Sequence, residues 1–427
     1  MIILISLVFV LGYIAIAFEH RIHINKAASA ILTGVICWAI YALYDDDSHG
    51  MVEQLGEHLS GISGILFFLL GAMTIVELID AHDGFQIIVD KVQTNSKRKL
   101  IWLVSILTFF LSAVLDNLTT TIVMISFIRK LVGDPKERWF LAGLIIISAN
   151  AGGAWSPIGD VSTTMLWIGN QITAINIIQK TFLPSLVCMI IPTLFVGWSV
   201  KGDITRPESY KKTEALTTTP FQRTAVFLLG IGCLLFVPVF KTITHLPPYM
   251  GILFGLGVMW VVTEIIHSEK DDEEKGLLSV NHALKKIDTP SILFFLGILL
   301  SVATLETTGI LNTLSIEMNE AIGNLYAINT SIGLLSAIVD NVPLVAAIQG
   351  MYGLEVYPTD HYFWEFLAYC AGTGGSCLII GSAAGVAAMG LEKIDFIWYL
   401  KKISWLALIG YLAGAAVYIL QQELFHI

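Results

Sequence analysis

The chain has 427 residues, of which 55% are hydrophobic and only 14% are charged, and its formal net charge is −10. A soluble globular protein carries about 25% charged residues, so the composition excludes a soluble enzyme and predicts a polytopic, multi-pass membrane protein. The acidic balance and the absence of a basic block in the sequence also argue against a nucleic-acid partner.

Ten apolar segments can serve as membrane crossings, which take about 20 helical residues each. Four further segments are too short, and they form two pairs, each interrupted by an Asp-Asn step. We interpret each pair as a re-entrant hairpin that enters and leaves the membrane on one side. The hairpins cover 100–130 and 325–352, and the crossings are 1–18, 27–44, 64–82, 139–170, 181–200, 223–240, 248–266, 290–310, 363–391 and 402–422.

Two of these crossings contain residues that a continuous lipid-facing helix does not need. The segment 139–170 holds Gly152, Gly153, Pro157 and Gly159 in its middle, and 363–391 holds a similar glycine-rich stretch. Glycine and proline release the backbone from its helical hydrogen bonds. Freed backbone groups are tolerated at membrane depth only where protein or a water-filled site satisfies them. We therefore predict two broken helices whose breaks bind an ion.

The basic residues fix the orientation of this layout. With both termini outside the cell, 22 of the 24 Lys and Arg residues fall on the cytoplasmic side, and only Lys180 and Lys241 fall outside. The positive-inside rule is satisfied by this arrangement. It predicts outer loops that contain acidic residues, among them Glu53 and Glu57 in one loop and Glu317 and Glu320 in another. We expect a multi-pass protein of the cell inner, or plasma, membrane.

The two halves of the chain repeat each other. Residues 65–69 recur as 292–296, 112–117 recur as 336–341, and the glycine-rich break at 152–160 recurs at 374–382. Each half has five crossings, an odd number, so the second half must be inserted upside down. The predicted fold is an all-α membrane protein of two inverted repeats, 1–200 and 223–427, joined by a cytoplasmic linker at 201–222. Each repeat contains one broken helix and one hairpin.

Polar residues at the hairpin tips and breaks are the candidate ion ligands. The first tip and first break offer carboxylate, amide and hydroxyl oxygens, which suit a hard cation, and a buried carboxylate can hold either a cation or a proton. Sodium itself is expected at Asp116, Asn117, Asn150 and Asp160. The full cation- and proton-binding set is Asp116, Asn117, Thr120, Asn150, Ser156, Asp160, Ser162 and Thr163.

The second tip and break predict a second, weaker site. It has one carboxylate fewer, because Ser382 stands where Asp160 stands in the first repeat. Glu77 and Glu306 occupy matching helices and are either proton-relay groups or packed structural acids. The second-site residues are Ser336, Asp340, Asn341, Thr373, Ser376 and Ser382.

The stretches SAVLDNLTTT, SANAGGAWSPIGDVSTT and SAIVDNVPL resemble the NhaD-type sodium/proton antiporters of the ion transporter superfamily, over essentially the whole chain. The resemblance implies export of Na⁺ or Li⁺ in exchange for H⁺, without a cofactor. It also implies a homodimer in which an elevator-like transport domain moves against a fixed scaffold in the membrane lipid. The family's functional positions correspond to Ser112, Asp116, Asn117, Asn150, Asp160, Ser162, Thr163, Ser336 and Asn341, with Ser162 in place of an expected threonine.

Two other functions were weighed. A sodium-coupled organic-anion or oxyanion transporter on the same fold is the main alternative, but both hairpin tips carry Asp-Asn instead of Ser-Asn and no Lys or Arg sits in the predicted core. An intramembrane aspartyl protease is disfavoured because the stretch ending in Asp160 lacks the first glycine of a GxGD motif. The sequence predicts a transporter, not an enzyme.

Overall fold

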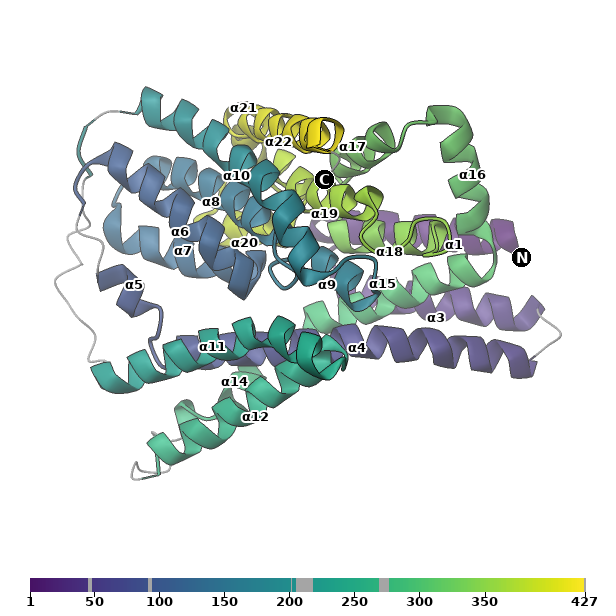
Figure 1. Cartoon of the computed structure of the whole chain (residues 1–427), viewed down its shortest axis with the longest axis horizontal. Helices are drawn as coiled ribbons and strands as arrows, with labels where there is room; N and C mark the ends of the chain where they lie inside the picture. Colours follow the sequence, from purple (N-terminus) through teal and green to yellow (C-terminus); the bar gives the residue numbers. More distant parts are fainter. Residues whose placement is uncertain (45–47, 91–93, 201, 205–217, 269–275, 426–427) are drawn as a thin grey trace.

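The structure is a computed structural model, and it describes residues 1–44, 48–90, 94–200, 202–204, 218–268 and 276–425. All of the regular elements in these ranges are helices (Figure 1), which confirms the all-α prediction. Most of the predicted linker at 201–222 lies outside the described residues.

Eight helices in the described ranges are long and apolar enough to cross a membrane. Seven of them coincide with predicted crossings, and the eighth is an arm of the first predicted hairpin. The other three predicted crossings are not among them: α1 (Ile2–Ala17) has 16 residues, and each broken helix is divided in two by its break. The eight are α3 (Lys26–Tyr44), α4 (Ser48–Ala81), α6 (Lys97–Leu115), α10 (Ala174–Ser199), α11 (Pro220–Thr244), α12 (Pro248–Ile266), α15 (Thr289–Thr307) and α22 (Ser404–Phe425).

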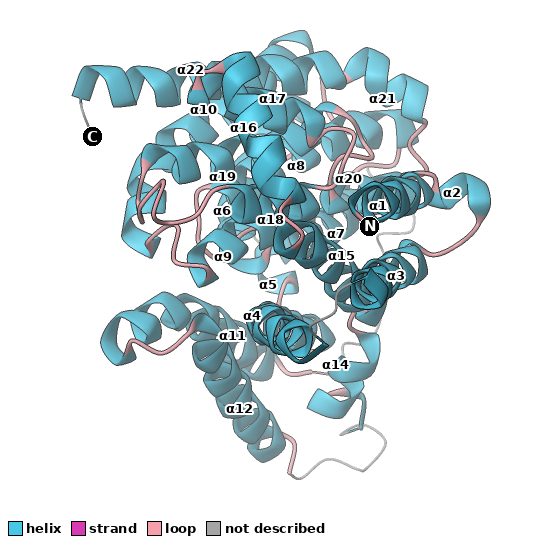
Figure 2. Cartoon of the chain, turned by 90° about the vertical axis from the view of Figure 1, so that its right-hand side faces the viewer, coloured by secondary structure: helices cyan, strands magenta, loops and turns pink. Residues whose placement is uncertain are grey.

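The helices form two groups that we call the scaffold and the core (Figures 1 and 2). The scaffold helices are α1, α3, α4, α11, α12 and α15, and their buried side chains share one hydrophobic cluster. A second cluster joins most of the core. Besides α6, α10 and α22, the core contains α7 (Asn117–Leu131), α8 (Pro135–Ala154), α9 (Val161–Ile168), α17 (Leu325–Leu335), α18 (Asn341–Met351), α19 (Tyr362–Gly374), α20 (Ala383–Glu392) and α21 (Phe396–Lys402).

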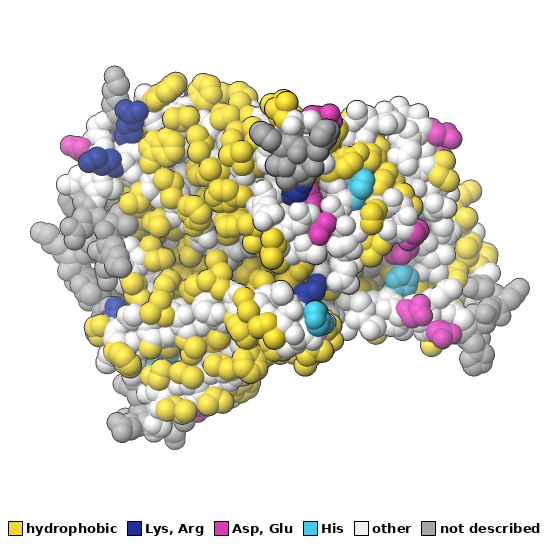
Figure 3. Space-filling model, in the orientation of Figure 1, with side chains coloured by type: hydrophobic (Ala, Val, Ile, Leu, Met, Phe, Trp, Pro, Cys, Tyr) yellow, Lys and Arg dark blue, Asp and Glu magenta, His cyan; other side chains and the backbone are white. Residues whose placement is uncertain are grey.

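The outer surface matches a lipid environment. Exposed apolar side chains cover much of the face shown in Figure 3. Exposed apolar residues of α6, α10 and α11 include Phe110, Trp198 and Leu228. Along the same face, Lys and Arg side chains are more frequent toward the left end and acidic side chains toward the right end. This polarity agrees with a cytoplasmic end rich in basic residues.

Both broken helices have their breaks at the predicted positions. The first consists of α8 and α9 with residues 155–160 between them, and the second consists of α19 and α20 with a short 3₁₀ turn, η2 (Gly375–Cys377), in the gap. Pro157 lacks a backbone N–H donor, which explains why the helix cannot continue through the first break. The second break has no proline and relies on glycine.

The predicted hairpin arms are helices with their turns at the Asp-Asn steps. Only Asp116 separates α6 from α7, and residues 336–340 separate α17 from α18. Asp116 has a φ of 78°, a conformation that non-glycine residues rarely adopt. Holding it there costs roughly 1–3 kcal/mol, and such strain is typical of functional positions. The entry and exit of each hairpin on one side of the membrane stays a prediction.

Two loop predictions were wrong. The outer loop that was expected to contain Glu53 and Glu57 is instead the start of α4, which begins at Ser48 and runs for 34 residues. The stretch between α15 and the second hairpin forms an amphipathic helix, α16 (Ile310–Ile322). Both stretches carry exposed charged residues, which masked their helical character when only apolar segments were read as helices.

Close backbone packing at a glycine makes one substitution severe. A Cβ atom on Gly374 would lie 1.9 Å from the carbonyl oxygen of Gly333 on α17. We expect Gly374→Ala to destabilise the protein by about 3 kcal/mol, because two helix backbones must separate. Gly390→Ala is the control, since a Cβ there meets nothing within 4 Å. The thermal unfolding midpoints of the two purified variants test this, and equal midpoints would contradict the packing.

Candidate functional site

Asp160 lies at the centre of a buried polar network. It follows the first break and precedes α9, and its side chain is 2% exposed. Asn117 Nδ2 donates to its Oδ1 atom at 2.8 Å, and Asn341 Nδ2 donates to its Oδ2 atom at 2.8 Å. The Ser162 hydroxyl also donates to Oδ2. The tips of both hairpins therefore converge on one carboxylate.

Asn150 connects the two halves of the chain in this network. Its Oδ1 atom accepts a hydrogen bond from Asn117 at 3.0 Å. Its Nδ2 atom donates to the hydroxyls of Ser376 at 2.9 Å and Ser382 at 3.0 Å, both in the second break. Four residues assigned by sequence to a first site and three assigned to a second site thus belong to one continuous hydrogen-bond network, which sequence patterns could not reveal.

Asp116 lies beside this network with a separate set of partners. Its carboxylate accepts from the backbone N–H of Thr119 at 2.7 Å and from the Thr119 hydroxyl at 2.9 Å. It lines a small, mostly apolar cavity between the core and scaffold residues of α4, α11 and α12, together with Ile158 and Thr164. Asp116 directly precedes Asn117, the residue that donates to Asp160 Oδ1.

Neither carboxylate is neutralised by a basic side chain. Within the described residues, every hydrogen-bond donor to Asp116 and Asp160 is a neutral amide, hydroxyl or backbone group. The ion pairs in the same ranges lie elsewhere. Isolated buried carboxylates are costly, so this site calls for a positive ion or a proton.

The predicted hydroxyl ligands fall into two groups. The Oγ1 atoms of Thr120 and Thr163 are buried and have no hydrogen-bond partner, which leaves their oxygens available to a ligand. Four other hydroxyls bind backbone carbonyls instead; three of them join a hairpin to a broken helix, and that of Thr373 bonds within its own helix, α19. These are Ser112 on Ala149 at 2.6 Å, Ser336 on Ala371 at 2.9 Å, Ser156 on Ala113 at 2.5 Å and Thr373 on Tyr369 at 2.6 Å.

Asp340 lies at the second tip and faces a cavity. Its carboxylate accepts from the backbone N–H of Val342 at 3.2 Å. The cavity, of about 410 Å³, is also lined by Ser382 and by Lys26, Glu19 and Tyr13 from the scaffold side. Within the described residues, the carboxylate makes no hydrogen bond to Ser336, Thr373 or Ser376 of the predicted second site, whose hydroxyls bond elsewhere.

The two candidate relay acids have different surroundings. Glu77 on α4 forms an ion pair with Lys286 of α14 (Val280–Lys286) at 3.4 Å. It lines a cavity of about 300 Å³ together with Asp80, Lys130 and Thr119, the partner of Asp116. Glu306 is exposed near the end of α15. Glu77 therefore shares a cavity with the Thr119 that binds Asp116, whereas the Glu306 carboxylate lies near Gly350 of α18.

Several residues that line these cavities were not singled out from the sequence. Leu118 and Asp288 line both the 300 Å³ and the 410 Å³ cavities, and Lys286 and Tyr13 line one each. They come from α7, the start of α15, α14 and α1, which are distant along the chain. No local pattern marks them, because their proximity arises only from packing.

The chain matches the family model described as "Citrate transporter" over residues 2–364. Sodium/proton antiporter 1 of Arabidopsis thaliana is 48% identical over 416 residues, which cover 97% of this chain and 71% of that protein. Sodium/proton antiporter 2 of the same plant is 44% identical, with 97% and 98% covered. The Na(+)/H(+) antiporter NhaD of Alkalimonas amylolytica is 28% identical, with 98% and 91% covered.

Proposed function

We infer the activity from one premise, that the chain belongs to the citrate transporter family and, within it, to the NhaD-type sodium/proton antiporters. It is a secondary active transporter that exchanges Na⁺ for H⁺ across a membrane. It is not an enzyme.

The observation that carries this function is a pair of carboxylates among neutral donors, of which Asp160 is buried and Asp116 is partly buried. A low-dielectric site favours the protonated acid, and a bound cation favours the carboxylate. The same oxygens therefore hold a proton or a sodium ion, but not both at once. A site that crosses the membrane loaded with one and returns with the other performs exchange. Carboxylate, amide and hydroxyl oxygens suit a small hard cation, so Li⁺ is expected to compete with Na⁺.

The proposed mechanism is alternating access by two inverted repeats. Its support is that matching contacts occur in the two halves: Ser112 binds the carbonyl of Ala149 as Ser336 binds that of Ala371. Likewise, Gly159 packs on the Ser112 carbonyl and Gly381 on the Ala337 carbonyl. On this basis the core moves like an elevator against the scaffold, in a homodimer of the plasma membrane with both termini outside.

The family description also raises citrate, and with it the alternative of sodium-coupled organic-anion transport. A multiply charged anion needs basic partners or free helix N-termini. The network around Asp160 instead presents a carboxylate and bonds in the described residues only to neutral side chains. Uptake of labelled citrate that requires sodium would favour the alternative.

The test is ion exchange by reconstituted protein. Proteoliposomes with an inside-acid pH gradient should lose that gradient when sodium is added, and not when choline is added. We expect Asp116→Asn to reduce this response to about 1% of the wild-type response, because the site loses a negative charge that interacts with the bound cation. Asp203→Asn, on the surface beyond α10, is the matched control. Normal exchange by Asp116→Asn would rule out the site.

A further inference from the structure

The contact between the core and the scaffold is asymmetric. On the core, the two cavities that reach the hairpin tips are lined by α7 and α20, including Lys130 and Ala387. In the predicted topology both helices run toward the cytoplasm. Their counterparts in the other repeat, α18 and α9, run toward the outside and are packed: Gln349 on α18 donates to the Met165 carbonyl of α9 at 3.3 Å.

One scaffold residue bonds directly to the outer end of the core. Lys241, near the end of α11, donates from Nζ to the carbonyl of Trp167 at 2.9 Å and to Asn170 Oδ1 at 3.3 Å. The same ammonium lies 4.9 Å from the centre of the Trp167 ring. A cation at a helix C-terminus binds its unsatisfied carbonyls and its negative dipole end. These contacts therefore hold α9 by its last turn.

Fixing the position of α9 also restrains the ion site. Asp160 immediately precedes this helix, which has eight residues and spans roughly 12 Å. The end of α9 is in turn tied to the core loop before α19, since Thr359 Oγ1 donates to the Asn170 carbonyl at 2.7 Å and Thr173 N donates to Asp360 Oδ1 at 2.6 Å. A contact that fixes α9 to the scaffold therefore also restrains the rest of the core.

The surfaces around this contact are otherwise suited to sliding. Scaffold residues that face Asp116 and the first break are apolar, among them Phe68, Met73, Leu234 and Ile252. Apolar contacts are not directional, so this face can shift without losing hydrogen bonds. The junction of α11 and α12, near Lys241, corresponds to the junction of α1 and α3 in the first repeat. There, the 410 Å³ cavity lined by Glu19 and Lys26 separates the scaffold from α20.

We propose that Lys241 is a latch that fixes the outer end of α9 to the scaffold. It thereby holds the transporter in the conformation of this structure, which we call inward-open because both cavities that reach the hairpin tips lie on the predicted cytoplasmic side. The proposal rests on the proposed antiport function and its topology. In inverted-repeat transporters the two repeats exchange conformations between states. In the outward-open state, the junction of α11 and α12 therefore releases α9, and the junction of α1 and α3 closes on α20.

Two reporter cysteines test the latch in purified protein in lipid nanodiscs. Ala387→Cys lies in the inward cavity and Ile168→Cys at the latched end of α9, and the five native cysteines are buried. With Lys241→Met, we expect maleimide labelling of the Ala387 reporter to slow at least fivefold and labelling of the Ile168 reporter to quicken by a similar factor. Lys241→Arg should restore both rates.

The matched control is Lys180→Met, which removes the other outer lysine from α10, within the core. It should change neither rate. Unchanged labelling of both reporters in Lys241→Met would overturn the latch, and faster labelling of both would indicate unfolding instead of a shifted equilibrium and would equally overturn it. If the rates move in opposite directions while the wild type exchanges no sodium, the latch stands and the proposed antiport falls.

Discussion

Asp160→Asn is expected to weaken sodium binding, and with it sodium/proton exchange, by about 100-fold. The carboxylate accepts hydrogen bonds from Asn117 on one oxygen and from Asn341 and Ser162 on the other. An asparagine has only one acceptor oxygen, so its NH₂ group must face a donor in either orientation. The variant loses the charge and gains a donor–donor clash. A hydrogen bond to a charged group is worth about 1.5–3 kcal/mol, so sodium affinity should fall by about 100-fold.

The measurement is the sodium concentration that half-collapses a pH gradient in proteoliposomes. Asp134→Asn is the control, because Asp134 caps the start of the same broken helix by accepting from Lys136 N at 3.0 Å. Asparagine caps helices as well as aspartate does, so this variant should behave as wild type. An Asp160→Asn protein with an unchanged half-maximal sodium concentration would mean that the ion binds elsewhere.

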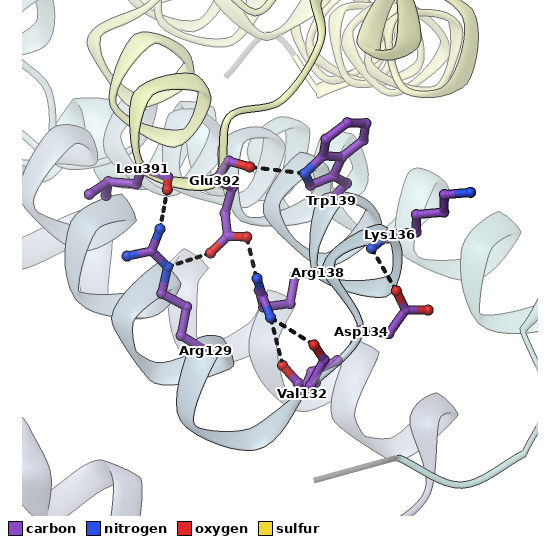
Figure 4. Close-up of polar contacts among 9 residues, drawn as sticks. Arg129, Val132, Asp134, Lys136, Arg138, Trp139, Leu391 and Glu392 are labelled. Atoms are coloured by element: carbon purple, nitrogen blue, oxygen red, sulfur yellow. Dashed lines mark hydrogen bonds and ion pairs between the residues drawn. The ribbon is translucent and has the colours of Figure 1, made fainter. Parts of the chain in front are cut away.

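The second large effect is expected at a buried ion cluster near the end of α20. The carboxylate of Glu392 is 1% exposed and contacts Arg129 Nε at 2.5 Å and Arg138 Nε at 2.9 Å, while Trp139 Nε1 donates to its backbone carbonyl (Figure 4). Arg138 and Arg129 are 19% and 43% exposed, so removing Glu392 should cost about 2 kcal/mol, between the values for a surface pair and for a fully buried pair. We expect Glu392→Ala to lower the thermal unfolding midpoint by roughly 5 °C or more, because α20 loses its attachment to α7 and α8.

An ion pair in the same region whose glutamate is more exposed than Glu392 is the control. Lys97 and Glu137 lie 2.5 Å apart, but their side chains are 22% and 31% exposed. Surface pairs contribute only about 0–1 kcal/mol, so Glu137→Ala should shift the midpoint much less. Intrinsic tryptophan fluorescence during heating measures both variants. Equal shifts would show that the cluster at Glu392 does not hold the core together.

The sequence predicted those parts of the site that local chemistry determines. Glycine and proline mark where α8 and α19 stop, and the Asp-Asn steps mark the hairpin turns, because these residues act on their own backbone. The start of α4 was missed because its first turns are polar. The meeting of Asn341 with Asp160 and the ion pair between Glu77 and Lys286 join residues far apart in the chain. Only the packing of the helices brings such partners together.

Because Asp160 lies between Asn117 and Asn341, an ion bound to its carboxylate affects the tips of both hairpins. A sodium ion that draws on the Asp160 oxygens competes with the amide groups of both hairpin tips, and the link through Asn150 extends this competition to Ser376 and Ser382. Loading at one point is therefore felt simultaneously on the two sides of the molecule. Such a network can make the conformational change of the empty carrier different from that of the loaded carrier. An exchanger needs this difference to avoid uncoupled leak of its ion gradient.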